Sequence, residues 1–379
     1  MVRSLSLPPL PVTTVGSWPR PAALLHARRT DPALAGRLAD DAVIDFLALQ
    51  EEIGLDVVTD GELRRDNFYS FVADKLDGVQ LMTLAEMLEL IEDKAGFERI
   101  LQTLDVPAYA ISNPTCVGRI TRRRPLALDD VRFAKAHTRK PLKVTLPGPY
   151  LLTRAMYVRE ASAAAYPDKE ALAEDVVRIL VEEIEGLRAE GIDFLQLDEP
   201  VLTELVFAGG ATRTFMCAAL ARTQNPTAEL ELAVSLLARV LKAADGIRTG
   251  LHVCRGNWSR NEATLLSGSY HALKPWLARV PVDQLVLEYA TERAGGLIDF
   301  PNKELGLGVV NPRTDRVETS EEIAASVRAA LKLFGPERLF LNPDCGFATF
   351  ANRAVGEADI AARKLRAIVS AARALREEM

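Results

Sequence analysis

Hydrophobic and polar positions along the chain repeat one pattern: an amphipathic helix, a glycine, a short apolar strand and a polar residue at the end of that strand. In the clearest copy, apolar residues from Leu172 to Leu187 fall on one helical face. Gly191 suits the left-handed position that ends a helix. Ile192–Leu197 then has the composition of a buried strand, and Asp198 follows it. The pattern therefore predicts helices and strands in alternation.

The pattern predicts eight strands, and alternation with helices indicates that they are parallel. They are Val12–Val15, Leu55–Thr59, Leu142–Leu146, Ile192–Leu197, Thr249–Val253, Gln284–Leu287, Leu305–Val310 and Arg338–Leu341. Eight such units in 379 residues predict the α/β class and a single (β/α)8 TIM barrel spanning residues 1–379. Residues from about 76 to 125 do not fit the repeat, so we interpret them as an insertion within the barrel. We expect a helix within Met82–Leu104 and a hairpin around Cys116–Thr121.

Composition narrows the class of function. The net charge of −6 gives no electrostatic reason to expect a nucleic acid or a membrane as partner. There is no apolar run of the roughly 18 residues that a membrane span needs, and no signal peptide is visible. The four cysteines show no CxxC spacing. We therefore expect a cytoplasmic protein with free thiols, of which Cys116 and Cys217 have no partner pattern and are predicted to fill the core.

Polar residues that suit catalysis gather where the predicted strands end, which is where barrel enzymes place their active sites. They are Ser17, Glu62, Asp198, Glu204, His252, Cys254, Glu288, Asp344 and Cys345.

Four of these residues form a candidate metal site. His252 and Cys254 are two apart on one strand and so point to the same face, Glu288 ends the next strand, and Cys345 follows the last one. Two thiolates, an imidazole and a carboxylate suit zinc. The carboxylate would be the ligand most easily replaced by a substrate thiol, whose free pKa is about 8.5. The alternative is that the cysteines and the histidine simply fill the core.

A set of motifs in the same order along the chain resembles the catalytic C-terminal barrel of cobalamin-independent methionine synthase. They are Thr13-Thr14-Val15-Gly16-Ser17-Trp18-Pro19, Asp60-Gly61-Glu62, Gly148-Pro149, Gln196-Leu197-Asp198-Glu199-Pro200, His252-Val253-Cys254, Glu288 and Asn342-Pro343-Asp344-Cys345-Gly346. The glycine-proline pieces are weak singly, and the complete His/Cys/Glu/Cys set makes the resemblance specific.

The resemblance implies roles for individual residues. The zinc ligands would be His252, Cys254, Glu288 and Cys345, and an acid on the folate side would be Glu204. The amino acid part of homocysteine would be held by Val15, Gly16, Ser17, Glu62 and Asp198. Two carboxylates suit an ammonium group, and the backbone amides of a tight turn suit a carboxylate. The alternative for Glu62 and Asp198 is helix capping or a salt bridge inside the barrel.

Three departures concern the methyl-donor side. The family's large enzymes carry an additional N-terminal barrel, for which this chain has no room. Arg313 stands near the family's proton-donor histidine, and an arginine cannot donate a proton at neutral pH. The residues that contact folate in the family are not evident in the corresponding segments, Tyr109–Ile111 and Thr153–Ala155. The arginines at 64–65 and 122–124 either meet an anionic donor or form a solvated charged face.

The leading hypothesis is zinc-dependent methyl transfer to homocysteine, giving methionine, with methyltetrahydrofolate or methylcobalamin as donor and a corrinoid protein as a conceivable partner. A second hypothesis keeps the zinc-thiolate chemistry and changes the thiol, as in epoxyalkane–coenzyme M transferase. A third is a non-catalytic component that binds zinc or a corrinoid. Two carboxylates favour an ammonium-bearing thiol over a sulfonate.

Overall fold

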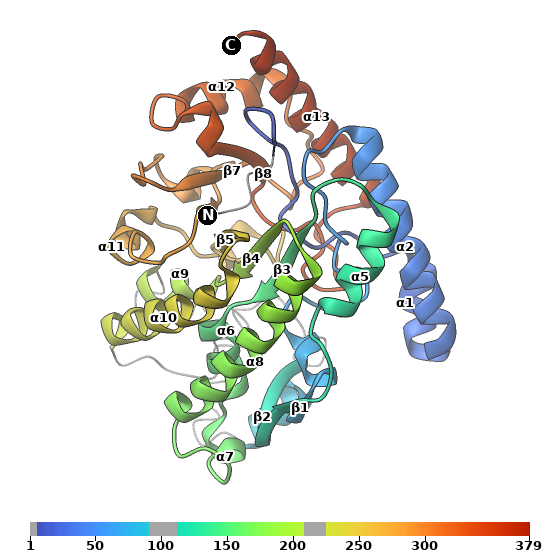
Figure 1. The fold of residues 1–379 in the computed structure, drawn as a ribbon, viewed down its shortest axis with the longest axis vertical. Helices are drawn as coiled ribbons and strands as arrows, with labels where there is room; N and C mark the ends of the chain where they lie inside the picture. The colour runs from blue at the N-terminus through green and yellow to red at the C-terminus, as the bar shows by residue number, and fades with distance from the viewer. Residues whose placement is uncertain (1–5, 91–111, 208–224) are drawn as a thin grey trace.

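Six parallel strands form the centre of the molecule in the order in which they occur along the chain (Figure 1). The computed structural model describes residues 6–90, 112–207 and 225–379. The strands are β3 (Lys143–Pro147), β4 (Phe194–Asp198), β5 (Arg248–Val253), β6 (Gln284–Leu287), β7 (Glu304–Val310) and β8 (Leu339–Pro343). Each agrees with a predicted strand to within two residues at either end, which confirms the alternating pattern for this part of the sheet.

The first two predicted strands close the sheet into a barrel through single bridges instead of full ladders. Val12 pairs with Leu341 of β8, and Val58 pairs with Leu142 just before β3. The two segments also contact each other, because the backbone N–H groups of Asp56 and Val57 donate to the carbonyl of Val12. The N–H of Val12 donates to the Asp56 carboxylate, at 2.8 Å, instead of to a neighbouring strand. The fold is thus the (β/α)8 barrel that the sequence predicts.

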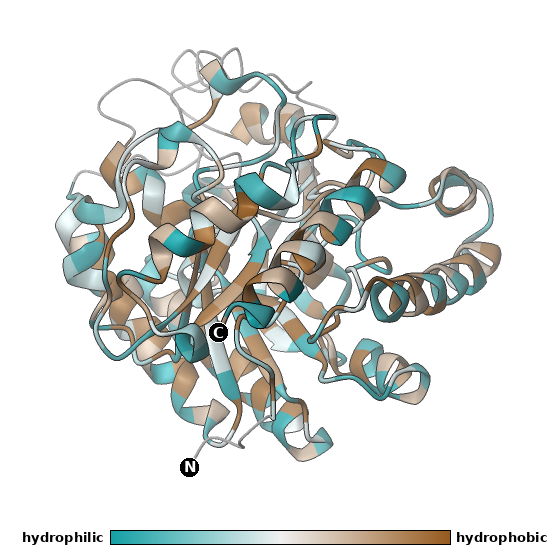
Figure 2. Ribbon diagram, turned by 90° about the horizontal axis from the view of Figure 1, so that it is seen from above, coloured by the Kyte–Doolittle hydropathy of each residue, from teal (hydrophilic) through white to brown (hydrophobic). Residues whose placement is uncertain are grey.

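Helices surround the sheet (Figure 1). They are α1 (Ala22–Thr30), α2 (Pro32–Ile53), α3 (Leu84–Leu90), α5 (Leu128–His137), α6 (Pro149–Met156), α7 (Arg159–Ser162), α8 (Lys169–Glu190), α9 (Val201–Phe207), α10 (Pro226–Leu241), α11 (Lys274–Leu277), α12 (Ser320–Ala330) and α13 (Ala358–Glu377). The long helices mix hydrophobic and hydrophilic residues, as helices with one buried face do (Figure 2). Asp168 caps the start of α8, and Gly191 ends it at φ 74°.

Most of the hydrophobic core lies between the strands and the helices, and a second, small cluster lies inside the barrel. Val57, Phe194 and Phe340 form this inner cluster, with the Phe194 and Phe340 rings 6.2 Å apart. Phe194 begins β4, whereas Asp198 ends it, so the aromatic plug fills the amino-terminal end of the barrel. The polar residues at the carboxyl ends of the strands therefore lie at the opposite end. No described helix is long and apolar enough to cross a membrane.

The insertion contains an antiparallel hairpin of β1 (Leu76–Thr83) and β2 (Ser112–Arg122). The prediction of a hairpin around Cys116–Thr121 was wrong in position, because this segment lies within the single strand β2, which pairs with the distant β1; Cys116 is buried as predicted. The predicted helix within 82–104 is described only as α3, because residues 91–111 lie outside the described part, as does Cys217. Whether residues 76–125 make up the whole insertion stays a prediction.

Candidate metal and thiol site

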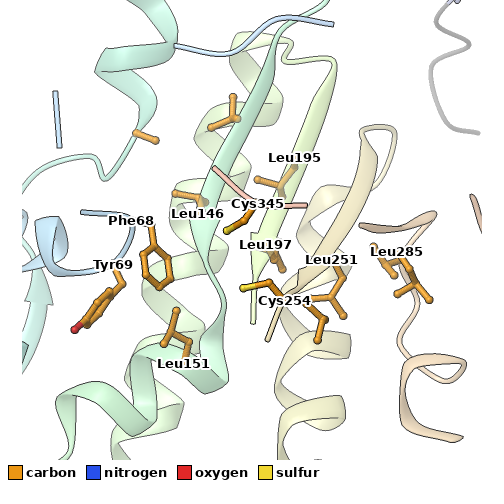
Figure 3. Close-up of a cluster of buried hydrophobic side chains, with 14 of the residues drawn as sticks. Phe68, Tyr69, Leu146, Leu151, Leu195, Leu197, Leu251, Cys254, Leu285 and Cys345 are labelled. Carbon is orange, nitrogen blue, oxygen red and sulfur yellow. The ribbon is translucent and has the colours of Figure 1, made fainter. Parts of the chain in front are cut away.

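Three of the four predicted metal ligands meet in a buried cluster at the carboxyl end of the barrel. His252 lies on β5, Cys254 follows that strand, and Cys345 follows β8. One ligand atom from each lies within 4.8 Å of the others, and all three residues are buried. The Cys254 and Cys345 sulfurs face the same region, on the side of Phe68 (Figure 3). An imidazole and two thiols at this spacing form a donor set that suits zinc.

The imidazole of His252 is oriented from behind by Asp198. Asp198 of β4 stands opposite His252 in the strand register, and its Oδ1 lies 3.0 Å from His252 Nδ1. Gln196 fixes the carboxylate by donating to the same oxygen at 2.8 Å. The other ring nitrogen, Nε2, is buried and has no hydrogen-bond partner among the described residues. A carboxylate that orients a histidine while the second nitrogen stays available is the usual arrangement around a protein-bound zinc.

The three ligand candidates influence one another electrostatically. A hydrogen bond with Cys345 lowers the pKa of Cys254 to about 6, and this outweighs burial. The same hydrogen bond and burial raise the pKa of Cys345 well above its usual range. Burial alone would lower the pKa of His252, but the negative charge of Cys254 and the hydrogen bond with Asp198 raise it to about 10. A divalent cation bound to all three must therefore displace protons.

The predicted substrate residues line one narrow cavity together with the cluster. Val15, Gly16 and Ser17 follow the first strand segment, Glu62 follows the second, and Asp198 ends β4. Each faces the same cavity as His252, Cys254 and Cys345. The structure thus brings together from five βα loops the residues that the motifs suggested.

Glu62 is held in an unusual backbone conformation. Its φ is 53°, in the left-handed region that residues with a Cβ rarely adopt, and it is 2% exposed. Its Oε1 accepts a hydrogen bond from the Thr145 hydroxyl at 2.8 Å. Gly16 has no room for a Cβ because the Glu62 carboxylate packs against it. Burial raises the pKa of Glu62, and so does the nearby charge of Asp198, although Arg65 opposes both. A cationic group placed between Glu62 and Asp198 would relieve this repulsion.

Glu288, the fourth predicted ligand, is not part of the cluster. Its carboxylate accepts hydrogen bonds from the backbone and guanidinium of Arg255, at 3.0 and 3.2 Å, and from Arg293 at 3.0 Å. Asn257 donates to it as well. Burial would raise the pKa of Glu288, but the two arginines hold it below the usual range. Ligation of a metal by Glu288 would require it to leave at least some of these partners, so this role stays a prediction.

Glu204 and Arg313, which the resemblance places near the methyl donor, do not line this cavity. Glu204 on α9 is buried, and its carboxylate lies 3.7 Å from the Arg154 guanidinium of α6. Arg313 is buried and donates to Asn257 at 2.9 Å and to Glu262 at 2.5 Å. Neither Glu204 nor Arg313 lines the cavity that contains the cluster. The predicted role of Glu204 toward a methyl donor therefore stays a prediction.

The two arginine clusters have partners within the protein. Arg64 pairs with Asp40 and with Asp130, the latter at 3.1 Å, and Arg122 pairs with Glu183 at 2.6 Å. These contacts join α2, α5, α8 and the hairpin. They favour a structural role for both clusters over contact with an anionic donor.

Some residues of the site escaped the sequence analysis. Phe68, Asn257 and Thr349 line the cavity, but each lies in a loop that carries no periodic signal. The contact between Asp198 and His252 was also missed, although two polar residues at the ends of neighbouring strands were a usable signal. Thr145 lies inside a predicted strand, where the alternation of side chains could have indicated that it points into the barrel.

Fold and site together define a (β/α)8 barrel protein with a candidate metal site at its mouth. The family model described as "Cobalamin-independent synthase, Catalytic domain" matches residues 10–374, so the chain belongs to this family. Methionine synthase of Sulfurisphaera tokodaii is 29% identical over 98% of this chain and 94% of that protein. Methionine synthase of Thermococcus kodakarensis is 29% identical over 99% of this chain and 96% of that protein.

Solved structures show the same fold over nearly the whole length. A B12-independent methionine synthase from Shewanella, in complex with selenomethionine, has a TM-score of 0.74 and 24% sequence identity, covering 98% of each chain. The putative vitamin-B12 independent methionine synthase from Listeria monocytogenes has a TM-score of 0.66 and 19% identity, covering 98% of this chain and 99% of the other. Both likenesses support the barrel assignment.

Proposed function

We propose that this protein is a zinc-dependent methyltransferase that methylates the thiol of homocysteine to give methionine. The observation that carries the proposal is the buried cluster of His252, Cys254 and Cys345, which shares a cavity with Glu62 and Asp198. Membership in the cobalamin-independent synthase family supports it, as do relatives named methionine synthase along almost the full chain.

In this proposal His252, Cys254 and Cys345 hold the zinc, and Glu288 is the predicted fourth ligand. Zinc bound there supplies Lewis acidity, which lowers the pKa of a substrate thiol and keeps its sulfur nucleophilic at neutral pH. Asp198 keeps His252 in the orientation in which Nε2 faces the cluster, since it engages Nδ1. Burial of the cluster excludes water from the reacting sulfur.

Glu62 and Asp198 would bind the ammonium group of homocysteine, and the backbone of Val15–Ser17 would bind its carboxylate. Both carboxylates line the cavity, and their mutual repulsion favours a cation between them. The same repulsion disfavours a sulfonate, so homocysteine is a better substrate for this cavity than a mercaptosulfonate such as coenzyme M.

We propose methyltetrahydrofolate as the donor, since the family is defined as cobalamin-independent. That description gives no support to methylcobalamin or to a corrinoid protein as partner. Because Arg313 is bound to Asn257 and Glu262, we do not assign it proton delivery. We place the reaction in a reducing cytoplasm, where the free thiols of Cys254 and Cys345 remain available for a metal.

The test is methionine formation by zinc-loaded protein given homocysteine, with methyltetrahydrofolate in one reaction and methylcobalamin in another. Methionine only with methyltetrahydrofolate supports the whole proposal. Methionine only with methylcobalamin keeps the thiol and replaces the donor. If coenzyme M is alkylated and homocysteine is not, the substrate assignment is wrong. Tight zinc binding without turnover of any thiol would favour the non-catalytic alternative.

A further inference from the structure

Arg20 lies behind the candidate site and is 7% exposed. It follows the Val15–Ser17 turn by three residues, and among the described residues its two Nη atoms donate only to main-chain carbonyl groups. The acceptors are the carbonyls of Trp18 at 3.4 Å, Glu62 at 2.8 Å, Arg65 at 3.1 Å and Ala348. These four carbonyls belong to three different βα loops. A planar guanidinium with five donors can serve several acceptors in this way, whereas an ammonium cannot do so in the same geometry.

Each of the three loops carries residues of the candidate site. The first, residues 15–20, carries Ser17; the second, residues 60–66, carries Glu62; and the third, residues 345–349, carries Cys345. The loops also touch one another directly, since Trp18 N donates to Gly61 O and Phe347 N donates to Ser17 O, each at 2.9 Å. Arg20 therefore occupies the junction of the loops that surround one side of the cavity.

The contact with Glu62 acts on a backbone that is not in a relaxed conformation. Gly61 has a φ of 68° and Glu62 a φ of 53°, so the turn places two successive residues in the left-handed region. A residue with a Cβ holds this conformation only if its surroundings fix it. The side chain of Asp60 accepts from Glu62 N at 3.0 Å, and Arg20 binds Glu62 O. Arg20 thus helps to fix the carbonyl of Glu62, which also accepts from Arg65 N at 3.0 Å.

We propose that Arg20 is a positioning residue that holds the loops of Ser17, Glu62 and Cys345 in register, and so sets the affinity for the amino acid part of the thiol substrate. This inference rests on the proposed function only for the identity of the substrate, whereas the effect of Arg20 on the loops is independent of that function. Arg20 is not among the residues that line the cavity, so its effect on the substrate is transmitted through Ser17 and Glu62.

The chain offers a matched control in Arg28. This residue also donates to main-chain carbonyls of the second loop, those of Arg65 at 2.9 Å and Leu63 at 2.6 Å. Among the described residues, its hydrogen bonds reach neither Glu62 nor the third loop. An arginine that only stabilises the fold and one that joins the three loops can therefore be compared within one protein.

The experiment compares zinc-loaded wild type, Arg20→Met, Arg20→Lys and Arg28→Met by amide hydrogen exchange and by steady-state kinetics. We expect Arg20→Met to speed exchange about tenfold or more in residues 15–20, 60–66 and 345–349 together, because charge-assisted hydrogen bonds are lost from all three. Arg28→Met should speed exchange only around 60–66. We expect Arg20→Met to raise KM for homocysteine about ten- to hundredfold with a smaller change in kcat, and Arg20→Lys to recover part of the loss.

The outcomes separate this inference from the proposed function. If Arg20→Met changes exchange only near residue 20, or changes KM no more than Arg28→Met does, Arg20 is not a positioning residue. If the wild type does not use homocysteine, the proposed function is wrong, and the exchange pattern still decides the role of Arg20. Arg20→Lys provides the same exchange comparison if Arg20→Met does not fold.

Discussion

Two pairs of buried carboxylates in this protein differ in how far their oxygens are already hydrogen-bonded within the fold. Glu62 and Asp198 line the cavity at the barrel mouth, and the Oε2 atom of Glu62 has no hydrogen-bond partner among the described residues. Glu183 and Glu199 are both 0% exposed, and each accepts backbone N–H groups at the start of a helix. The first pair, here called the open pair, keeps hydrogen-bonding capacity for a ligand. The second pair, here called the closed pair, uses its hydrogen-bonding capacity within the fold.

The closed pair shows how completely a carboxylate can be used as a helix cap. Glu183 on α8 accepts from the N–H groups of Leu126, Ala127 and Leu128, at 2.7 to 2.9 Å, and pairs with Arg122. It thereby ties the start of α5 and the end of the hairpin to the barrel. A carboxylate at a helix amino terminus is stabilised both by free N–H groups and by the helix dipole.

Asp198 and Glu199 are neighbours in sequence and divide these two roles between them. Glu199 accepts from Tyr150 N at 2.8 Å and Leu151 N at 2.9 Å at the start of α6, and its side chain leaves no room for a Cβ on Gly148. Helix capping, which was an alternative for Asp198, thus belongs to the next residue. The comparison teaches that an unsatisfied polar atom on a cavity, and not burial of charge alone, marks a ligand site.

The largest effect on zinc binding and activity should follow from removing a thiol of the candidate metal cluster. Cys254→Ser and Cys345→Ser should each lose zinc, with activity falling by more than about 100-fold, because loss of a ligand costs more than the loss of an outer-shell partner. Metal content measured on purified protein, together with activity, checks this. Cys116→Ser, which changes a buried thiol far from the cluster, should keep its zinc. Full zinc retention in both ligand variants would remove the proposed metal site.

Removing Glu183, a carboxylate of the closed pair, should destabilise the fold and leave the metal and thiol site intact. Glu183→Ala should lower the free energy of unfolding by about 3–5 kcal/mol, because it breaks a buried ion pair and leaves three N–H groups unpaired. Denaturant unfolding measures this. The neighbouring Glu182→Ala removes only an exposed pair with Arg178 and should cost about 0.5 kcal/mol or less. A large loss of zinc or substrate affinity in Glu183→Ala would contradict the division between the two pairs.

Substitutions of the two carboxylates of the open pair should have different effects on zinc affinity. Glu62→Gln should weaken homocysteine binding about ten- to hundredfold and leave zinc affinity unchanged, since among the described residues no hydrogen bond joins Glu62 to His252. Asp198→Asn should weaken both, with a 10–100-fold loss of zinc affinity, because it contacts Nδ1 of His252. Competition with a zinc indicator and thiol-dependent kinetics measure the two quantities. Equal losses of zinc affinity in both variants would show that the two carboxylates do not differ in this way.

A smaller, pH-dependent effect concerns Lys143, which is buried inside the barrel below the open pair. Burial lowers the pKa of Lys143 to about 7, although the charges of Asp198 and Glu62 oppose this. Between pH 7 and the ordinary lysine pKa, the unfolded chain therefore binds more protons than the folded one, and stability rises with pH by at most about 1.4 kcal/mol per unit. Denaturant unfolding of wild type and Lys143→Met at pH 7, 8 and 9 measures this, and stability should rise more steeply, or fall less steeply, with pH in the wild type than in the variant.

The order of helices and strands could be predicted from the sequence alone, as could most of the polar residues that line the cavity at the barrel mouth. Periodicity is a local property, so the strand β5 and the orientation of His252 and Cys254 on one face could be predicted from residues a few positions apart. The position of Cys345 after the last predicted strand placed it at the same end of the barrel, and the structure brings it together with His252 and Cys254.

The partners of the individual polar residues could not be predicted in this way, because they depend on how distant segments pack together. Arg20 and Ala348 are 328 positions apart, and no local pattern indicates that one donates to the other. Glu288 has the right position for a ligand, yet Arg255 and Arg293 engage its carboxylate. Local periodicity fixes which side of a strand a residue faces, whereas a hydrogen bond requires donor and acceptor within about 3 Å. That distance depends on how separate loops pack at the barrel mouth, and packing is a property of the whole fold.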